Sequence, residues 1–154
     1  MQIAWMNPAA ITDITVHCTA TPEGRDNTAA EVTAWDVERF GQPSYHAVAE
    51  LDGDVVQTLR PDQRGCHTAK HNTGNLGFSY VGGTTSLSAG AKPKDTRTDA
   101  QKASMERQIR VWLKAHPTIK RIRGHRQWPG VNKACPSFDV AAWLRSIGLG
   151  AYAV

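Results

Sequence analysis

The sequence predicts a single α/β domain in which a central mixed β-sheet is flanked by about three helices. Strand-like runs alternate irregularly with amphipathic segments, which favours a sheet whose strands are not all parallel. The length of 154 residues matches one domain, and no repeat or low-complexity tract divides the chain. We therefore expect one domain over residues 1–154, with an N-terminal extension at residues 1–10.

The first strand is predicted at residues 11–21, "ITDITVHCTAT". Apolar side chains alternate with polar ones, which places Ile14, Val16 and Cys18 on one face of the strand. The apolar face should contact the core. His17 is therefore expected on the opposite face, pointing outward.

A helix and a hairpin should follow this strand. Residues 28–41 open with the capping-box pair Thr28 and Glu31 and end at a glycine, which is a common helix stop. Residues 45–60 contain two strand-like runs around an Asp-Gly pair, whose glycine tolerates the positive φ of a tight turn. This pattern favours an antiparallel β-hairpin.

The C-terminal half predicts a strand at residues 75–83 and two more helices. The first of these helices starts at the capping-box residue Thr98 and stops at Pro117. The second is expected to start near Ser137 and to end at a glycine. Residues 83–97 are small and polar, which is typical of an exposed loop.

Composition limits the classes of function. No run approaches the roughly 20 apolar residues that span a bilayer, so we expect no membrane insertion. The first residues have neither the basic start nor the unbroken apolar stretch of a signal peptide, so we expect synthesis in the cytoplasm with reduced cysteines. The net charge of +4 favours an anionic partner, although the basic run at residues 120–126 fits a solvated face equally well.

Three cysteines at irregular spacing argue against a disulfide framework. Packing, metal binding or nucleophilic catalysis remain as roles for Cys135. A catalytic zinc needs about three protein ligands and one open position, and His17, His125 and Cys135 could supply them from the ends of predicted elements. However, His125 and Cys135 are ten residues apart, which matches no compact zinc motif, and a buried structural cysteine is the alternative.

Short motifs give a stronger signal. In chain order they are "VHCTAT", "YHAVAELDG", "HTAKHNTGNLG", "VGG", "GHRQW" and "KACPSFD". This series resembles the type-2 N-acetylmuramoyl-L-alanine amidases, most of all the phage lysozymes of that family, which are related to the peptidoglycan recognition proteins. The resemblance covers about residues 11–147, and "KACPSFD" after "GH" is its most specific part.

The resemblance implies a zinc amidase with one Zn²⁺ per chain at one end of the sheet. It assigns the zinc ligands to His17, His125 and Cys135. Zinc suits amide hydrolysis because it activates water near neutral pH and polarises the carbonyl under attack.

The resemblance also implies two catalytic residues. Lys133 would stabilise the developing oxyanion, and Tyr45 would orient the attacking water. His67 is placed in a substrate cleft, and Asn72 either lines the same cleft or belongs to a polar loop. His46 should point to the strand face opposite Tyr45 and is expected to be a hydrogen-bonded core histidine.

The implied function is hydrolysis of the amide bond between N-acetylmuramic acid and L-alanine in peptidoglycan. Separately from the resemblance, we expect the single catalytic domain to be a monomer. Such an enzyme would act as a phage endolysin made in the host cytoplasm, and it would need a separate pore to reach the wall.

Two other functions compete with this one. The first is a non-catalytic peptidoglycan-binding protein or a regulator of a host or phage RNA polymerase, although non-catalytic receptors of this kind typically lack the cysteine ligand. The second is a cysteine hydrolase, which leaves the pairing of His17 with His125 unexplained.

Overall fold

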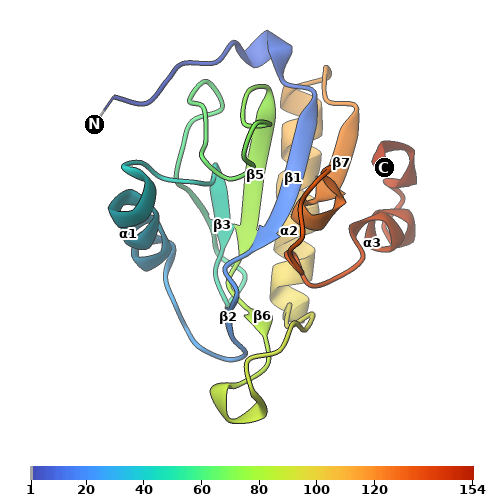
Figure 1. The fold of residues 1–154 in the computed structure, drawn as a ribbon. Helices are drawn as coiled ribbons and strands as arrows, with labels where there is room; N and C mark the ends of the chain where they lie inside the picture. Colours follow the sequence, from blue (N-terminus) through green and yellow to red (C-terminus); the bar gives the residue numbers. More distant parts are fainter. Residues whose placement is uncertain (1) are drawn as a thin grey trace.

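This computed structural model describes residues 2–154 and contains a five-stranded sheet in the order β4-β3-β5-β1-β7 (Figure 1). Its strands are β1 (Asp13–Cys18), β3 (Ala47–Ala49), β4 (Val55–Gln57), β5 (Asn75–Tyr80) and β7 (Arg121–Gly124). β3 and β4 form the predicted antiparallel hairpin, whereas the other neighbouring pairs are parallel. The predicted mixed sheet is therefore confirmed. β2 (Thr21–Pro22) and β6 (Gly83–Thr84) form a separate pair of short parallel strands.

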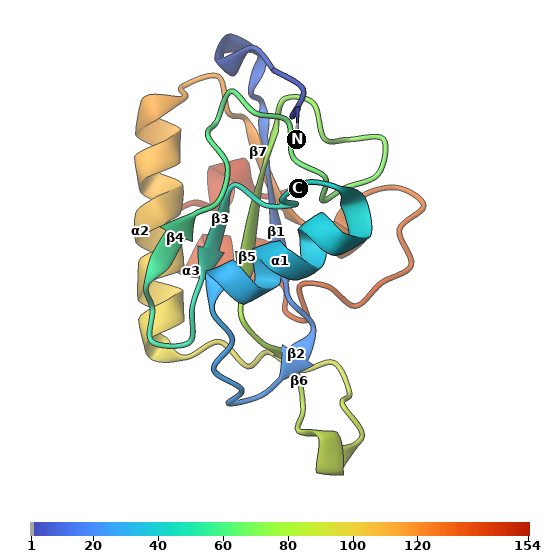
Figure 2. The ribbon, with the colours of Figure 1, turned by 90° about the vertical axis from the view of Figure 1, so that its left-hand side faces the viewer.

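Helices cover both faces of the sheet. α2 (Asp99–Ala115) and α3 (Val140–Ser146) lie on one face, and α1 (Ala29–Phe40) lies on the other (Figure 2). Both predicted capping boxes form, with Thr28 at the start of α1 and Thr98 at the start of α2. Among the described residues, none of the helices combines the length and apolar character needed to cross a membrane.

α3 begins later than predicted, at Val140 instead of near Ser137. Ser137 has a φ of 68°, which a helix cannot accommodate. The side chain of Asp139 then accepts a hydrogen bond from the backbone N–H of Ala142 at 2.9 Å and caps the helix. The periodic apolar pattern extends beyond the true start because Phe138 is also buried.

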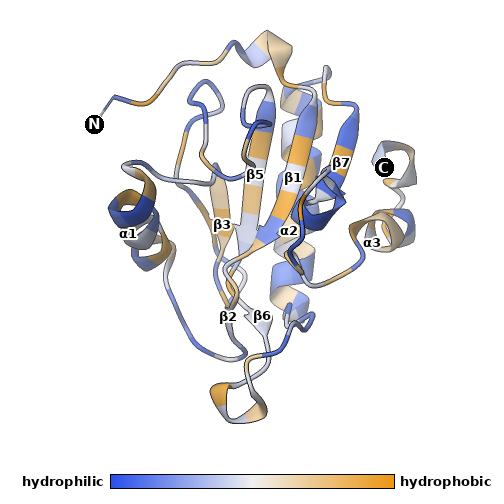
Figure 3. Ribbon diagram, viewed as in Figure 1, coloured by the Kyte–Doolittle hydropathy of each residue, from blue (hydrophilic) through white to orange (hydrophobic). Residues whose placement is uncertain are grey.

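The larger core lies between the sheet and the two helices α2 and α3. Ile14 and Val16 point into it from β1, as the alternation predicts, and they pack in one buried cluster with Met105, Ile109 and Leu144. The central strands are accordingly among the most hydrophobic segments (Figure 3). Burying each such side chain contributes roughly 1.5–3 kcal/mol, so this layer fixes β1 and the residues at its end.

The opposite face of the sheet is covered as well. Val32 of α1 forms a smaller buried cluster with Val48 of β3 and with Val81. His17 lies on this face, as predicted, but it does not point into solvent, because it is only 1% exposed. Its ring is enclosed by the rings of Tyr45, His67 and His125.

Residues 83–97 begin in β6 and extend into a projecting segment (Figure 1). Residues 86–95 are exposed, whereas Thr96 is buried. The guanidinium of Arg97 lies 3.3 Å from the centroid of the Phe138 ring and also binds Asp95. The returning end of this segment is therefore anchored beside the start of α3.

Two arginines of the basic run at residues 120–126 form ion pairs within the fold. Arg121 binds both carboxylate oxygens of Asp13 at 2.9 Å, and Arg123 approaches the same carboxylate at 3.5 Å. Burial alone would raise the pKa of Asp13, but these hydrogen bonds and charges outweigh it and lower that pKa. Lys120 and Arg126 are exposed, so only part of the run is a solvated basic surface.

Candidate metal centre and cleft

β1 and β7 are parallel neighbours, and their carboxyl ends bring His17 and His125 together. Val16 pairs with Gly124 in this register, so the two histidines that follow stand side by side. Their ring centroids are 4.6 Å apart. Sites in open α/β sheets commonly lie at the carboxyl ends of parallel strands, and this site follows that rule.

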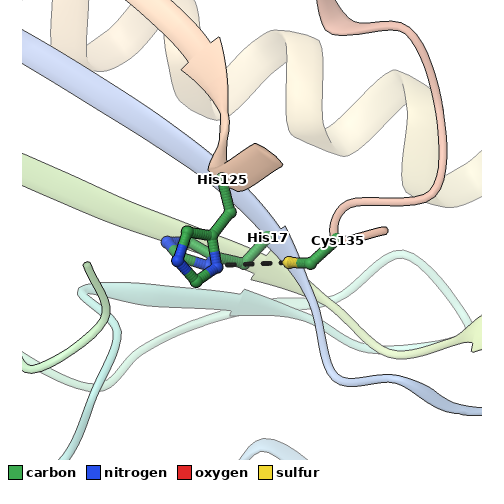
Figure 4. A group of neighbouring side chains, drawn as sticks. All are labelled: His17, His125 and Cys135. Carbon is green, nitrogen blue, oxygen red and sulfur yellow. Dashed lines mark hydrogen bonds between the residues drawn. The ribbon is translucent and has the colours of Figure 1, made fainter. Parts of the chain in front are cut away.

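Cys135 comes from the segment that packs directly on Gly124. A Cβ at Gly124 would lie 2.7 Å from Cδ of Pro136, so only glycine permits this close approach. The backbone N–H of Arg126 donates to the carbonyl of Cys135 at 2.9 Å, and the N–H of Cys18 donates to Sγ of Cys135 at 3.3 Å. These contacts hold Sγ 3.7 Å from Nδ1 of His17 (Figure 4).

The three residues predicted as ligands therefore form one group that could hold a metal ion. One ligand atom from each of His17, His125 and Cys135 lies within 4.8 Å of the others. Nitrogen and sulfur ligands of a tetrahedral zinc stand about 3.6 Å apart, and Nδ1 of His17 is 3.7 Å from Sγ of Cys135. Two imidazoles and one thiolate suit zinc and leave its fourth position open, so the donor set fits this ion.

The electrostatic environment keeps both histidines neutral, as metal binding requires. Burial, and then the charges of His67, His125 and Lys133, lower the pKa of His17 well below its ordinary value. Burial and the charge of Lys133 lower the pKa of His125 to about 4. Both rings can thus offer a lone pair at neutral pH.

The pKa of the Cys135 thiol is raised instead of lowered. Its interaction with the Cys18 thiol and its burial raise the pKa of Cys135, and Lys133 offsets this only in part. A bound cation stabilises the thiolate strongly enough to deprotonate a ligating thiol outright. Metal binding at this group should therefore release a proton.

Tyr45 and Lys133 flank the group. The ring centroid of Tyr45 is 5.1 Å from that of His17. Burial, followed by the charges of Cys135 and Asp36, raises the pKa of Tyr45, so its phenol stays protonated and acts as a hydrogen-bond donor. Lys133 is exposed and, with His125, lines a cleft of about 360 Å³.

The same cleft contains both residues predicted to bind substrate. His67 and Asn72 line it, although Oδ1 of Asn72 already accepts hydrogen bonds from the backbone N–H groups of His67 and Thr68. Arg39 and Phe40, at the end of α1, also line it. Sequence reasoning missed these two, because no motif or periodicity sets them apart from the rest of the helix.

A wider hollow of about 690 Å³ lies elsewhere, between α1 and β4. It is lined mainly by alanine, valine and threonine side chains and lies apart from the three candidate ligands. The smaller cleft is lined by the buried histidines His67 and His125, and buried titratable groups mark functional sites more specifically than volume does. We therefore assign the site to the smaller cleft.

His46 is a hydrogen-bonded core histidine, as predicted. One ring nitrogen, Nε2, donates to the carbonyl of Gln63 at 2.8 Å. The other, Nδ1, accepts from the backbone N–H of Gly77 at 3.0 Å. It lies outside the candidate ligand group and supports the hairpin against β5.

The metal-free protein should lose stability as the pH falls below about 6.5. Burial lowers the pKa of His46 to about 4 and that of His67 to about 3, whereas an unfolded histidine has a pKa of about 6.5. Between these values the unfolded chain binds more protons than the folded one. This stabilising effect is thus complete above about pH 6.5 and declines as the pH drops toward the folded-state values.

Thermal unfolding of the chelator-treated protein between about pH 7.5 and pH 5 measures this effect. The variant His46→Gln keeps a polar group at the position but cannot titrate, so its melting temperature should depend less steeply on pH. Equal slopes for the two proteins would contradict the assignment to His46.

A sequence profile of the family described as N-acetylmuramoyl-L-alanine amidase matches residues 7–138. The endolysin of Klebsiella phage KP32 is 32% identical over 131 residues, which cover 84% of this chain and 83% of that protein. Among solved structures, the N-acetylmuramoyl-L-alanine amidase LysCS from Clostridium intestinale has a TM-score of 0.73 at 15% identity, covering 97% of this chain and 93% of that one. Bumblebee PGRP-SA has a TM-score of 0.73 at 18% identity, covering 99% and 89%. The two solved structures have the same fold as this chain, and the sequence matches identify its family: this chain belongs to the N-acetylmuramoyl-L-alanine amidase family.

Proposed function

We propose that this protein is a zinc-dependent endolysin that hydrolyses the amide bond between N-acetylmuramic acid and L-alanine in peptidoglycan. The observation that carries the proposal is the convergence of His17, His125 and Cys135 beside a cleft lined by Lys133, in a chain of the amidase family. The endolysin of phage KP32 supports a role in host lysis.

One Zn²⁺ per chain would be held by His17, His125 and Cys135. When bound, zinc supplies a Lewis acid that polarises a carbonyl and lowers the pKa of water to about 7. The protein encloses the group on the side of β1, where His17 is buried, and opens it toward the cleft at His125. A substrate amide would therefore approach the group from the cleft, where Lys133 also lies.

Lys133 would stabilise the negative charge that develops on the amide oxygen. Its side chain lines the same cleft as His125, and its charge helps to lower the pKa of both His17 and His125. A fixed positive group beside a developing oxyanion is a strong contribution to catalysis.

Tyr45 would orient the attacking water through its hydroxyl. A general base must be deprotonated before it can accept a proton. Burial raises the pKa of this phenol above its ordinary value, so the hydroxyl keeps its proton at neutral pH. Orientation therefore fits the site better than proton abstraction does. The cleft that His67 and Asn72 line would receive the stem peptide beyond the scissile bond.

The products of digestion test the proposed bond. A glycosidase of the usual kind needs two carboxylates across the bond, and the described residues that line the cleft include no Asp or Glu. We expect digestion of purified peptidoglycan to release new L-alanine amino groups and to leave glycan strands intact. Mass spectrometry should detect stem peptides without muramic acid, whereas new reducing sugar ends without free alanine amines would contradict the proposal.

Three further aspects of this function stay predictions. The protein is predicted to act as a monomer with one catalytic domain over residues 1–154. It is predicted to leave the host cytoplasm through a separate pore, and to contact an RNA polymerase. Sedimentation analysis tests the first, lysis with and without a co-expressed pore tests the second, and a pull-down with purified polymerase tests the third.

A further inference from the structure

We infer that His67 is a positioning residue of the metal site, which holds His17 in the tautomer whose Nδ1 is free to bind the metal. The inference rests on the proposed metal site. Nδ1 of His67 lies 3.0 Å from Nε2 of His17, and Nδ1 of His17 faces Sγ of Cys135 at 3.7 Å. One ring nitrogen of His17 thus faces His67 and the other faces the ligand group.

The protonation of His67 follows from its partners. Its Nε2 lies 3.1 Å from the carbonyl oxygen of Asn75, and a carbonyl only accepts, so Nε2 carries a hydrogen. The ring is buried, and none of the hydrogen bonds found for it within residues 2–154 involves a carboxylate. A second proton would create a buried cation without an anionic partner, which is unfavourable. Nδ1 of His67 is therefore a hydrogen-bond acceptor.

This acceptor determines the tautomer of His17. Two nitrogen lone pairs that face each other at 3.0 Å repel, so Nε2 of His17 must carry the hydrogen. A neutral imidazole has one N–H group, which leaves a lone pair on Nδ1 of His17, beside Cys135. Hydrogen bonds thus connect the carbonyl of Asn75 through His67 to His17, and such outer partners orient metal-binding histidines and make them more basic.

The fold builds a slot for the ring of His67. An added Cβ at Gly77 or at Gly65 would lie 2.7 Å from Cδ2 of His67, so two glycines make room for it. Oδ1 of Asn72 holds the backbone by accepting from the N–H of His67 at 2.9 Å. Both ring nitrogens are hydrogen-bonded within the protein, which suits support of His17 better than a polar contact with substrate.

Thr68 provides a matched control. Its hydroxyl lies 3.0 Å from Nδ1 of His67 and shares that acceptor, but it is not needed for the bond between the two histidines. Thr68→Val should therefore leave zinc affinity close to that of the wild type. A substitution at His67 that removes the acceptor Nδ1 should change zinc affinity directly.

Two substitutions separate the two ring nitrogens. His67→Asn places an amide oxygen near the position of Nδ1 and keeps the acceptor for His17. His67→Gln reaches the position of Nε2 and keeps the donor for the carbonyl of Asn75, but it loses the acceptor. We expect His67→Gln to weaken zinc binding by about 10–100-fold, as losses of such outer partners do. His67→Asn should recover most of that loss.

Zinc affinity is measured by competition with a chelator, without substrate, on proteins whose fold is checked by circular dichroism. Wild-type protein that binds no zinc would overturn the proposed function together with this inference. Wild-type protein that binds zinc, with equal affinity in His67→Gln or equal losses in both variants, would overturn the inference alone.

A measurement on the wild type does not depend on whether the variants fold. Long-range ¹H–¹⁵N correlation spectra of the zinc-loaded protein report which nitrogen of each histidine carries hydrogen. We expect both His17 and His67 to carry it on Nε2. A hydrogen on Nδ1 of His17 would overturn the inference.

Discussion

Replacing Cys135 with alanine is expected to remove bound zinc and to abolish turnover while the fold persists. Cys135 supplies the only sulfur in the group of three candidate ligands within the described chain. Loss of an outer partner alone costs about 10–100-fold in metal affinity, so loss of a direct ligand should cost more than about 100-fold. Metal analysis of the purified variant should detect little zinc, against about one ion per chain in the wild type.

Cys66→Ala is the matched control for this experiment. Cys66 lies on the cleft wall, next to His67, but it is not a member of the candidate ligand group. Its replacement removes a thiol and should leave zinc content unchanged. Chelation should abolish the activity of the wild type, and added zinc should restore it. Full activity of the metal-free wild type would contradict the zinc proposal and favour a cysteine hydrolase that uses Cys135.

Local signals in the sequence were sufficient for most of the fold. The capping boxes at Thr28 and Thr98 place the starts of α1 and α2 because they act within four consecutive residues. The alternation in β1 identifies its core face correctly for the same reason. The predicted start of α3 was wrong. Packing of the segment around Cys135 determines the backbone conformation of Ser137, and the apolar periodicity of the sequence does not reveal that packing.

The site was only partly predictable. The motifs predicted His17, His125 and Cys135 as ligands. Their proximity, however, depends on the register between β1 and β7 and on the close packing of Pro136 against Gly124. Burial of His17 was missed because its cover comes from segments distant in sequence, including His67 fifty residues away. Alternation within one strand describes the two faces of that strand, but it does not describe what covers each face.

Replacing Lys133 with alanine is expected to lower kcat by about 10²–10³-fold, which is the usual cost of removing one group that stabilises an oxyanion. Zinc content should stay unchanged, because Lys133 is outside the ligand group, and the fold should tolerate the change, because the side chain is exposed. Tyr45→Phe should also retain zinc and lose turnover, since it keeps the ring against His17 and removes only the hydroxyl.

The kinetic pattern distinguishes transition-state stabilisation from substrate binding. If Lys133 acts on the oxyanion, kcat should fall more than KM rises, because the negative charge exists in the transition state and not in the bound amide. Lys133→Arg keeps the positive charge and should recover part of the rate, whereas Lys114→Ala, which removes an exposed lysine on α2 outside the cleft, should leave the rate unchanged. A raised KM with an unchanged kcat in Lys133→Ala would instead make this residue a binding group for the anionic substrate.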